Sequence, residues 1–281
     1  MKQGDILQKR YEIRKVLGNG GTSKVYLVFD AHTKKYWALK ELCKADANEL
    51  KREAYETEIK FLQSVTHEAF PVMIDAFETD RAYYYVMEYV HGERMDLFLQ
   101  RVGSVRYEQA MEIMQNLCDA LAYLHGRTPQ LIYGDLKPAN VMLLPNRKLK
   151  LIDFGSVQTV DERKKYQMGT PGYAAPEQLK KDGQIDARSD VYSFGVLFYE
   201  LLIGEKFDGV YLENPFIDAD VREIIFHCTR MNQKSRYADM REVMQSMNKK
   251  QRRNGGLFLM KKGKQPFVIQ DLERTILQQN E

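Results

Sequence analysis

The sequence has few cysteines and no close pair of them. Its 281 residues include only Cys43, Cys118 and Cys228, which lie far apart along the chain. Disulfide frameworks and structural zinc sites use cysteines in even numbers or at short, recurring spacings. The scattered set therefore argues against both and fits a reducing compartment.

Long apolar runs and a strong excess of one charge are also lacking. The longest apolar stretch, residues 191–203, is broken by Tyr, Ser, Gly and Glu and is too short for a bilayer core of roughly 30 Å. Residues 1–14 contain no apolar signal core. Lys and Arg total 42 against 39 Asp and Glu, whereas nucleic-acid-binding domains are usually more basic. We expect a cytoplasmic protein with no membrane segment and no nucleic-acid partner.

The hydropathy pattern divides the chain into a strand-rich part and a helical part. The expected strands are residues 11–17, 24–29, 36–40 and 71–89, with one helix at 48–65 between them. The helical spacing of apolar residues predicts helices at 107–125, 190–203 and 221–231, and a small hairpin at 141–152. We therefore expect an α+β protein whose two parts meet near residues 90–92, and ligand sites favour such junctions.

A glycine-rich segment, residues 18–23, separates the first two expected strands. Its sequence is Gly-Asn-Gly-Gly-Thr-Ser. Glycine lets a backbone approach phosphate groups and point its N–H groups at them, but a plain hairpin turn would have the same composition. The segment departs from G-x-G-x-x-G at Ser23, and no Gly-Lys-Ser/Thr follows, so it is not a Walker loop. Alone, it leaves both interpretations open.

Lys40 closes the third expected strand. Such a lysine is often a surface residue that buries only its aliphatic stem. A functional role would need an acidic partner, and the expected helix offers Glu53, Glu56 and Glu58.

Three motifs follow in the second part of the chain. They are Tyr-Gly-Asp-Leu-Lys-Pro-Ala-Asn at 133–140, Asp-Phe-Gly at 153–155, and Ala-Pro-Glu at 175–177 after Gly169-Thr170. With the glycine-rich segment and Lys40, in this order, they resemble the signature set of the eukaryotic-type Ser/Thr protein kinases, most like their bacterial branch. The resemblance covers residues 9–248. It implies a bilobal kinase fold, with an N-lobe at 1–90, built from an antiparallel sheet and one main helix, and a larger helical C-lobe at 91–250.

The resemblance implies ATP and Mg²⁺, with Mn²⁺ as an alternative metal, and protein hydroxyl groups as acceptors. The residues expected to hold the phosphates are Gly18, Gly20, Gly21 and Lys40, with Glu58 as the partner of Lys40 by alignment of residues 61–65. Asn140 and Asp153 would bind the metal. Asp135 would accept the hydroxyl proton or orient the substrate oxygen, Lys137 would neutralise the γ-phosphate, and Thr170 would bridge these two.

The resemblance also places residues around the adenine ring. They are Val25 and Ala38 above it, Met142 below it, Met87 as the gatekeeper, and the backbone groups of Glu88 and Val90 at its edge. Two further residues would be structural: Asp190 would anchor the loop that carries Asp135, and Arg236 would pair with Glu177.

The chain departs from the family at Gly134, which replaces the arginine before the catalytic aspartate. That arginine normally pairs with a phosphorylated residue of the activation segment. In this segment, residues 153–177, Tyr166 stands where a Ser/Thr kinase would modify itself, and Ser156 and Thr159 are the upstream hydroxyls. We therefore expect a non-RD kinase whose basal activity does not need activation-segment phosphorylation. Residues 204–220 are shorter and less helical than in the family, which leaves the protein-substrate surface unpredicted.

A basic tail, residues 251–281, lies outside the resemblance. We expect it to be a solvated linker that folding does not need; a hairpin across 257–269, or the start of a further region, is the alternative.

Two other functions compete with an active kinase. One is a pseudokinase scaffold. The other is a phosphotransferase of the aminoglycoside or choline kinase sort, in which a glycine also precedes the catalytic aspartate but which lacks the Ala-Pro-Glu segment. The substrate and the oligomeric state are not predicted.

Overall fold

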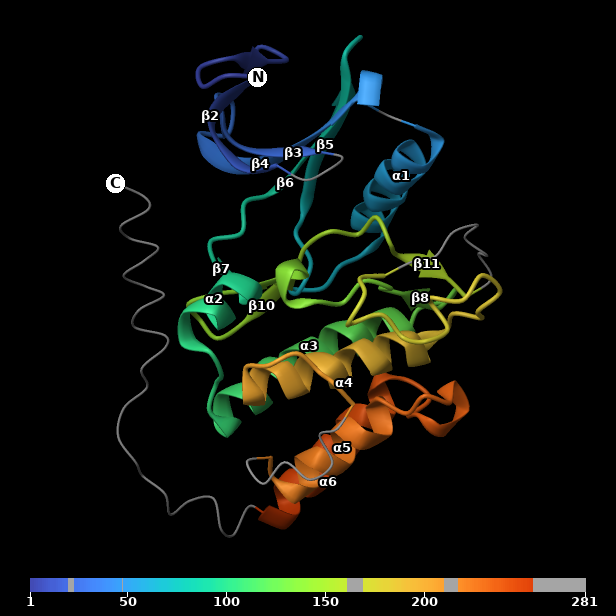
Figure 1. Ribbon diagram of the computed structural model, residues 1–281. Coiled ribbons are helices and arrows are strands. Elements are labelled where there is room, and N and C mark those ends of the chain that lie inside the picture. The colour runs from blue at the N-terminus through green and yellow to red at the C-terminus, as the bar shows by residue number, and fades with distance from the viewer. Residues whose placement is uncertain (20–22, 47, 161–168, 210–216, 255–281) are drawn as a thin grey trace. The chain divides into compact units, whose positions relative to one another are not determined.

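The computed structural model describes residues 1–19, 23–46, 48–160, 169–209 and 217–254. The chain divides into two compact units (Figure 1). Unit 1 comprises Met1–His91 and Ile152–Gly155, and unit 2 comprises Gly92–Leu151 and Ser156–Glu281.

Unit 1 is built on a six-stranded antiparallel sheet in the order β1-β2-β3-β4-β6-β5. Its strands are β1 (Ile6–Leu7), β2 (Tyr11–Asn19), β3 (Lys24–Asp30), β4 (Lys35–Cys43), β5 (Met73–Glu78) and β6 (Ala82–Glu88). The three strands expected between residues 11 and 40 are therefore confirmed. The run expected as strand at 71–89 consists of two strands joined by a short turn, in which Thr79 Oγ1 accepts the Arg81 and Ala82 amides.

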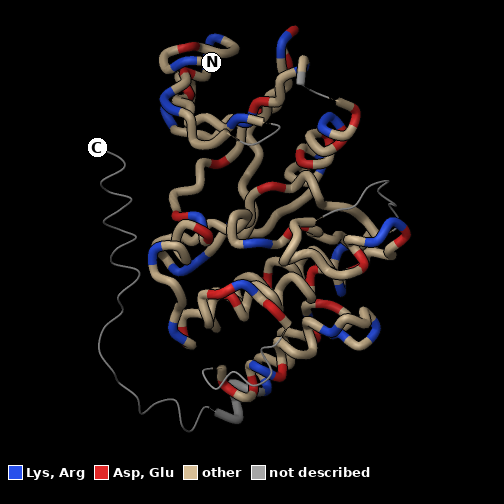
Figure 2. Tube along the Cα trace, in the orientation of Figure 1, with Lys and Arg blue, Asp and Glu red and all other residues tan. Residues whose placement is uncertain are grey.

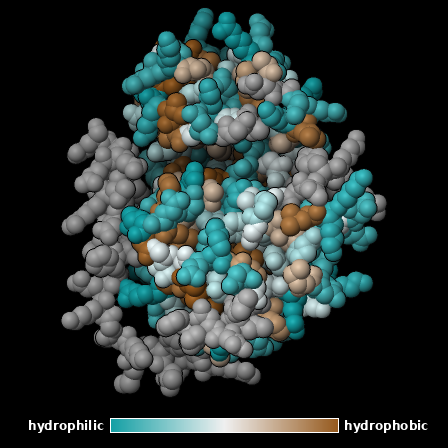
Figure 3. Space-filling model, viewed as in Figure 1, coloured by the Kyte–Doolittle hydropathy of each residue, from teal (hydrophilic) through white to brown (hydrophobic). Residues whose placement is uncertain are grey.

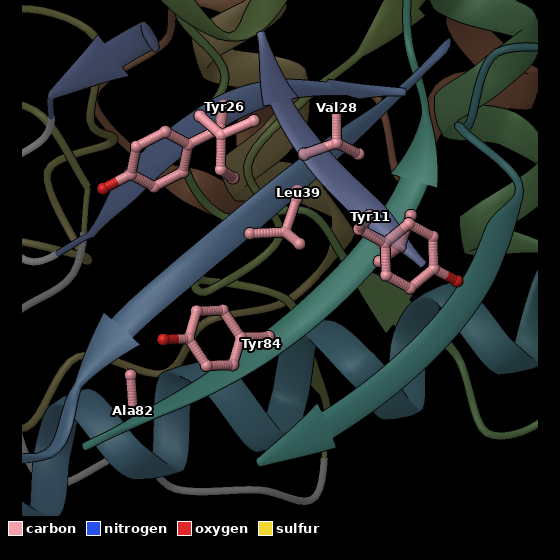
Figure 4. Close-up of a cluster of buried hydrophobic side chains, with 8 residues drawn as sticks. Tyr11, Tyr26, Val28, Leu39, Ala82 and Tyr84 are labelled. Atoms are coloured by element: carbon pink, nitrogen blue, oxygen red, sulfur yellow. The ribbon is translucent and has the colours of Figure 1, made fainter. Parts of the chain in front are cut away.

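One face of this sheet carries a cluster of buried hydrophobic side chains (Figure 4). The cluster contains Tyr11, Ile13, Tyr26, Val28, Leu39, Ala82, Tyr84 and Val86. Because side chains alternate between the faces of a strand, Tyr83, Tyr85 and Met87 project from the other face of β6. Tyr84 therefore lies in the hydrophobic cluster, whereas Tyr83 and Tyr85 lie on the opposite face of the sheet.

The main helix of unit 1, α1 (Glu49–Ser64), packs on that second face. A short 3₁₀ helix, η1 (Lys44–Asp46), precedes it. Asn48 caps α1, since its side-chain oxygen accepts the Lys51 amide at 2.9 Å. The Tyr55 ring lies 5.6 Å from both Tyr83 and Tyr85. These contacts fix one side of α1 against the sheet and leave the opposite side to solvent.

Unit 2 is mostly helical. Its α-helices within the described ranges are α2 (Met95–Val102), α3 (Tyr107–His125), α4 (Ala187–Ile203), α5 (Ala219–Cys228) and α6 (Met240–Asn254), with the 3₁₀ helices η2 (Pro138–Asn140) and η4 (Gln233–Ser235). Two small antiparallel sheets accompany them. One is β10-β9-β7 (Leu149–Leu151, Val141–Leu143, Glu93–Arg94), and the other is β11-β8 (Gln158–Thr159, Leu131–Ile132). The expected hairpin at 141–152 is confirmed, because Leu149 pairs with Leu143.

The core of unit 2 lies between α3, α4, α5 and α6. In α3, the stripe formed by Met114, Leu117, Leu121 and Leu124 is fully buried, as the helical spacing predicted. At Gly195 of α4, an added Cβ would lie 2.5 Å from the Cys228 Cβ. Only glycine therefore allows α4 and α5 to approach this closely.

Several details differ from the sequence expectations. The elements β1, α2 and α6 were not expected, nor were the short strands β7, β8 and β11. Helix α4 begins at Ala187 rather than residue 190, because Asp186 caps it. The last helix reaches Asn254, beyond the point near residue 248 where the core was expected to end, and residues 255–281 of the basic tail lie outside the described residues.

Within the part of the chain that the structure describes, the surface carries a mixture of charges and scattered exposed hydrophobic side chains, such as Ile6, Val72 and Met231. Acidic and basic residues are interspersed along both units (Figure 2). The face drawn in Figure 3 is mainly hydrophilic, with scattered hydrophobic residues. None of the helices in the described ranges combines the length and apolar character that crossing a bilayer requires.

Candidate active site

The first feature of the site is a buried ion pair in unit 1. Strand β4 carries Lys40 and helix α1 carries Glu58, and the Lys40 Nζ lies 2.6 Å and 2.7 Å from the two Glu58 carboxylate oxygens. The Glu58 side chain is 3% exposed. Of the other two glutamates considered, Glu56 pairs with Arg52 at 2.9 Å where both side chains are exposed, and Glu53 is exposed. Helical phase thus brings only Glu58 of these three to Lys40.

The charges around Lys40 keep it protonated. Burial acts to lower the pKa of the Lys40 ammonium, but the negative charges of Glu58 and Asp153 outweigh burial, so the pKa lies above its ordinary value. A permanently charged ammonium in a protected position is suited to holding an anionic group.

Glu58 accepts two further hydrogen bonds. The Tyr85 hydroxyl donates to Oε2 at 3.0 Å, and the Phe154 amide donates to Oε1 at 3.2 Å. The Phe154 ring stacks on Phe61 of α1, with 4.7 Å between centroids. These contacts attach the Asp-Phe-Gly segment to unit 1, although it comes from the middle of the sequence. Asp153 itself has a left-handed backbone, with φ of 74°.

The second feature is a hydrogen-bonded group in unit 2. Thr170 Oγ1 donates to Asp135 Oδ1 at 2.7 Å, and Lys137 Nζ donates to Asp135 Oδ2 at 2.7 Å. Lys137 Nζ also donates to Thr170 Oγ1 at 2.7 Å. The Asn140 amide nitrogen donates to the Asp135 carbonyl oxygen at 2.9 Å and to Oδ2 at 3.3 Å. The Asp135 carboxylate is therefore held in one orientation.

Asp190, at the start of α4, fixes the backbone just before Asp135. Its Oδ2 accepts the Tyr133 amide and its Oδ1 accepts the Gly134 amide, each at 2.8 Å. The buried His125 ring places Nε2 3.0 Å from Asp190 Oδ2 and accepts the Met240 amide at Nδ1. This buried carboxylate is thus satisfied by His125 of α3 and by two backbone amides of the 133–140 loop.

Gln178 joins the same loop to the Ala-Pro-Glu segment. Its amide nitrogen donates to the Gly134 carbonyl oxygen at 2.7 Å, and its amide oxygen accepts the Ala175 amide at 2.9 Å. Gly169 lies beside it; there φ is 94°, and an added Cβ would lie 2.8 Å from the Ala174 Cβ. The close approach of these segments therefore depends on glycine at 169 and an amide side chain at 178.

Arg236 and Glu177 form a two-pronged buried ion pair. The two guanidinium nitrogens lie 2.7 Å and 2.9 Å from the two carboxylate oxygens. Ser189 of α4 donates to the same carboxylate at 2.8 Å, and the guanidinium lies over the Tyr192 ring. The pair, together with Ser189, fastens the Ala-Pro-Glu motif to α4 and to the residue that follows η4.

The residues expected around adenine occupy both units. In unit 1, Ala38 is directly opposite Met87 across β4 and β6, and Val25 is directly opposite Lys40 across β3 and β4. Glu88 ends β6 and Val90 follows it, whereas Met142 lies on β9 of unit 2. Of the three glycines expected at the phosphates, Gly18 pairs with Val25, while Gly20 and Gly21 lie outside the described residues.

Sequence reasoning missed Tyr85, Gln178 and His125. Tyr85 belongs to a run that indicated only a strand, and Gln178 directly follows the Ala-Pro-Glu motif. Strand alternation could have separated Tyr85 from Tyr84. No sequence signal indicated which carbonyl and amide Gln178 would join.

Comparison with known proteins agrees with the motifs. Residues 11–254 match the family model described as the protein kinase domain. CBL-interacting protein kinase 10 of Oryza sativa subsp. japonica is 33% identical over 228 residues, covering 78% of this chain and 48% of that protein. The serine/threonine-protein kinase PknB of Mycobacterium leprae is 33% identical over 213 residues, covering 71% of this chain and 33% of PknB.

A further relative is CBL-interacting serine/threonine-protein kinase 13 of Arabidopsis thaliana, 34% identical over 214 residues that cover 72% of this chain and 41% of that protein. The chain thus spans between a third and a half of the length of the curated relatives it matches. The bilobal α+β fold expected from the motifs, with a sheet and one main helix before a larger helical part, is confirmed. The chain belongs to the protein kinase family, and its resemblance to the eukaryotic-type Ser/Thr protein kinases is confirmed.

Proposed function

We propose that this protein is an ATP-dependent Ser/Thr protein kinase of the non-RD type, which transfers the γ-phosphate of ATP to protein hydroxyl groups. The observation that carries the proposal is the fixed Asp135 carboxylate, held by Thr170, Lys137 and Asn140. Phosphoryl transfer requires positioning and charge neutralisation more than covalent chemistry, and this group offers both.

Asp135 would receive the substrate. Its carboxylate is oriented from both oxygens, so it can accept a hydrogen bond from an incoming hydroxyl and take its proton late in the transfer. Lys137 stands beside it with its ammonium directed at Asp135 and Thr170. The same ammonium would neutralise negative charge on the γ-phosphate. A lysine at this position is the family's pattern for Ser/Thr rather than Tyr acceptors.

Lys40 would hold the α- and β-phosphates. Glu58 keeps the ammonium in place, and the charges of Glu58 and Asp153 keep it protonated. Gly18, Gly20 and Gly21 would cover the phosphates with backbone N–H groups.

The apolar side chains of Val25, Ala38, Met87 and Met142 would contact the adenine ring. The Glu88 amide already donates to the Val72 carbonyl oxygen at 2.8 Å. At this position the carbonyl oxygen is therefore the backbone group that would accept a hydrogen bond from adenine, and Val90 would supply the next backbone contact.

Asp153 and Asn140 fit a magnesium ion in their donor chemistry. When bound, the ion neutralises the charge that develops on the phosphoryl oxygens. The Asn140 amide nitrogen is committed to Asp135, so the amide oxygen is the atom that would bind a cation. Mg²⁺ prefers one or two such protein oxygens together with substrate phosphates, and Mn²⁺ takes the same oxygen ligands.

The non-RD assignment follows from Gly134. This residue has φ of 80° and no side chain to pair with a phosphate. Its amide is bound by Asp190 and its carbonyl oxygen by Gln178. The 133–140 loop is therefore already held by the Asp190 carboxylate and the Gln178 amide, without a phosphorylated residue.

We propose protein substrates and a cytoplasmic location. The relatives named as serine/threonine-protein kinases support the first. The second rests on the three free thiols, Cys43, Cys118 and Cys228, which a reducing compartment would preserve.

Incubation of the purified protein with γ-labelled ATP, Mg²⁺ and cell lysate tests the proposal, with phosphosites mapped by mass spectrometry. We expect label on Ser and Thr side chains, and its loss in Lys40→Met and Asp153→Asn. Glu56→Gln, on the exposed side of α1, is the matched control and should retain activity. A pseudokinase would transfer no label, and a small-molecule phosphotransferase would label metabolites but no protein.

A further inference from the structure

We infer that Tyr85 is a positioning residue for ATP: its hydroxyl holds Glu58, and through Glu58 it holds Lys40, in the arrangement that binds the phosphates. The inference rests on the proposed function, because it takes Lys40 as the group that contacts ATP.

The sheet register places Tyr85 beside Lys40. The two residues are directly opposite each other across β4 and β6, and directly opposite residues of an antiparallel pair project from the same face. Helix α1 packs on this face through Tyr55. The Tyr85 hydroxyl can therefore reach Glu58 Oε2, at 3.0 Å, from the sheet side of the helix.

The Tyr85 side chain is held rigidly in unit 1. Strand β6 is paired on both sides, with β4 and with β5, and the Tyr85 side chain is among the largest fully buried ones. Its ring is confined by Tyr55, 5.6 Å away. Burial, followed by the charge of Glu58, raises the pKa of the Tyr85 hydroxyl well above its ordinary value, so it remains a donor. A rigid donor on the sheet thus fixes where the helix presents its carboxylate.

The Tyr85 hydroxyl matters because the Lys40 ammonium would bind both Glu58 and the ATP phosphates. A buried carboxylate that loses its donors is costly, and phosphates would draw the Lys40 ammonium away from Glu58. The Tyr85 hydroxyl and the Phe154 amide are donors that remain when the ammonium is shared. Glu58 can then stay in place while Lys40 binds the nucleotide.

The neighbouring Tyr84 provides a matched control. It lies on the opposite face of β6, in the hydrophobic cluster of Figure 4. Its hydroxyl donates to Glu41 at 3.2 Å, and Tyr26 donates to the same carboxylate. Tyr84→Phe therefore removes the part-buried hydrogen bond of a neighbouring tyrosine hydroxyl to a glutamate, without touching the Lys40–Glu58 pair.

The test measures nucleotide affinity directly. The dissociation constant of the non-hydrolysable imido analogue of ATP, with Mg²⁺, is measured by calorimetry for the wild-type protein, Tyr85→Phe and Tyr84→Phe. KM values for ATP and for a protein substrate are measured beside it. We expect Tyr85→Phe to weaken analogue binding and raise the KM for ATP about tenfold, the usual size for a lost hydrogen bond to a charged group. The KM for the protein substrate, and every value for Tyr84→Phe, should stay unchanged.

Two further variants keep the inference falsifiable. Tyr85→Met fills the cavity with a flexible side chain and should weaken binding at least as much as Tyr85→Phe, so it replaces that variant if the latter folds poorly. In a Glu58→Gln background, Tyr85→Phe should have no additional effect on binding, because its hydroxyl acts through Glu58.

The outcomes separate this inference from the proposed function. Wild-type affinity and KM in both Tyr85 variants would overturn the inference alone, as would an equal loss in Tyr84→Phe. A wild-type protein that bound no nucleotide would overturn the proposed function and the inference with it.

Discussion

Thr170 Oγ1 donates a 2.7 Å hydrogen bond to Asp135 Oδ1, although 35 positions separate the two residues in the sequence. Lys137 donates to both of them, so these three side chains form one hydrogen-bonded group. The activation segment is thereby tied to the residue proposed to receive the substrate hydroxyl.

This contact predicts a selective effect of substitution at Thr170. In Thr170→Ala, Asp135 loses one of the donors that orient its carboxylate, so we expect kcat to fall about tenfold. Thr170→Ser keeps the hydroxyl and should stay within about twofold of the wild type. Steady-state kinetics with saturating ATP and protein substrate measure both. Wild-type kcat in Thr170→Ala would show that the bridge plays no part in turnover.

The buried Arg236–Glu177 pair predicts a large loss of stability. Lysine cannot donate to both carboxylate oxygens in the planar geometry of arginine, and breaking a buried pair typically costs about 3–5 kcal/mol. We expect Arg236→Lys to lower Tm by about 6–20 °C. Arg241→Lys, at an exposed pair with Asp239, is the control and should change Tm little. Equal melting temperatures for the two variants would contradict this role.

Asp30 predicts a pH-dependent contribution to stability. It is fully buried, and its hydrogen bonds to the Arg10 guanidinium hold its pKa well below the usual range. A depressed pKa in the folded state means that the stabilisation is present above the unfolded pKa of about 4 and is lost as the pH falls below it. Asp30→Asn should cost about 2–3 kcal/mol at pH 7.

The difference between Asp30→Asn and the wild type should shrink progressively from pH 5 towards pH 3. Thermal unfolding at several pH values measures it, with the exposed Asp80→Asn as a control. A difference that stayed constant, or grew, on acidification would refute the assignment of this charge pair.

Gly134 predicts that basal activity is independent of phosphorylation. Phosphate on the activation segment acts as a switch only where a cationic side chain lies close enough to pair with it. Gly134 provides no such side chain. Arg163, Lys164 and Lys165 are the substitute cations that the sequence offers; these and Tyr166 lie outside the described residues. Phosphatase treatment, Thr159→Ala and Tyr166→Phe should each leave the rate within tenfold, which corresponds to about 1.4 kcal/mol in the barrier. A larger fall in any of them would refute the prediction.

The sequence predicted the helices that have a long stripe of regularly spaced apolar residues and a recognisable capping residue at one end. Helix α3 spans residues 107–125 as expected, because its apolar stripe is continuous and Gly126 ends it. Helix α1 was expected one residue longer at each end, and Asn48 proves to be its cap. Helix α2 was missed because its eight residues are too few for a periodic pattern and its N-cap, Arg94, makes no side-chain capping bond.

Contacts that depend on register could not be predicted in this way. Whether Tyr84 or Tyr85 faces Glu58 is decided by the pairing of Lys40 with Tyr85 across β4 and β6, and a shift of one residue would exchange them. The role of Gln178 depends on the path of two loops that approach each other at Gly169. Family motifs named the residues expected to carry chemistry, whereas the side chains that hold them in place required the folded structure.

The measurement that tests the central claim most directly is transfer of labelled phosphate by wild-type protein and by Asp135→Asn. Asparagine has nearly the same shape and can still accept from Thr170, but it carries no charge and cannot take the hydroxyl proton. Both proteins are incubated with γ-labelled ATP, Mg²⁺ and a protein substrate, and folding is checked by thermal unfolding. The account predicts label on Ser and Thr residues with the wild type and a loss of at least about a hundredfold with folded Asp135→Asn. Equal transfer by the two proteins, or no transfer by the wild type, would contradict it.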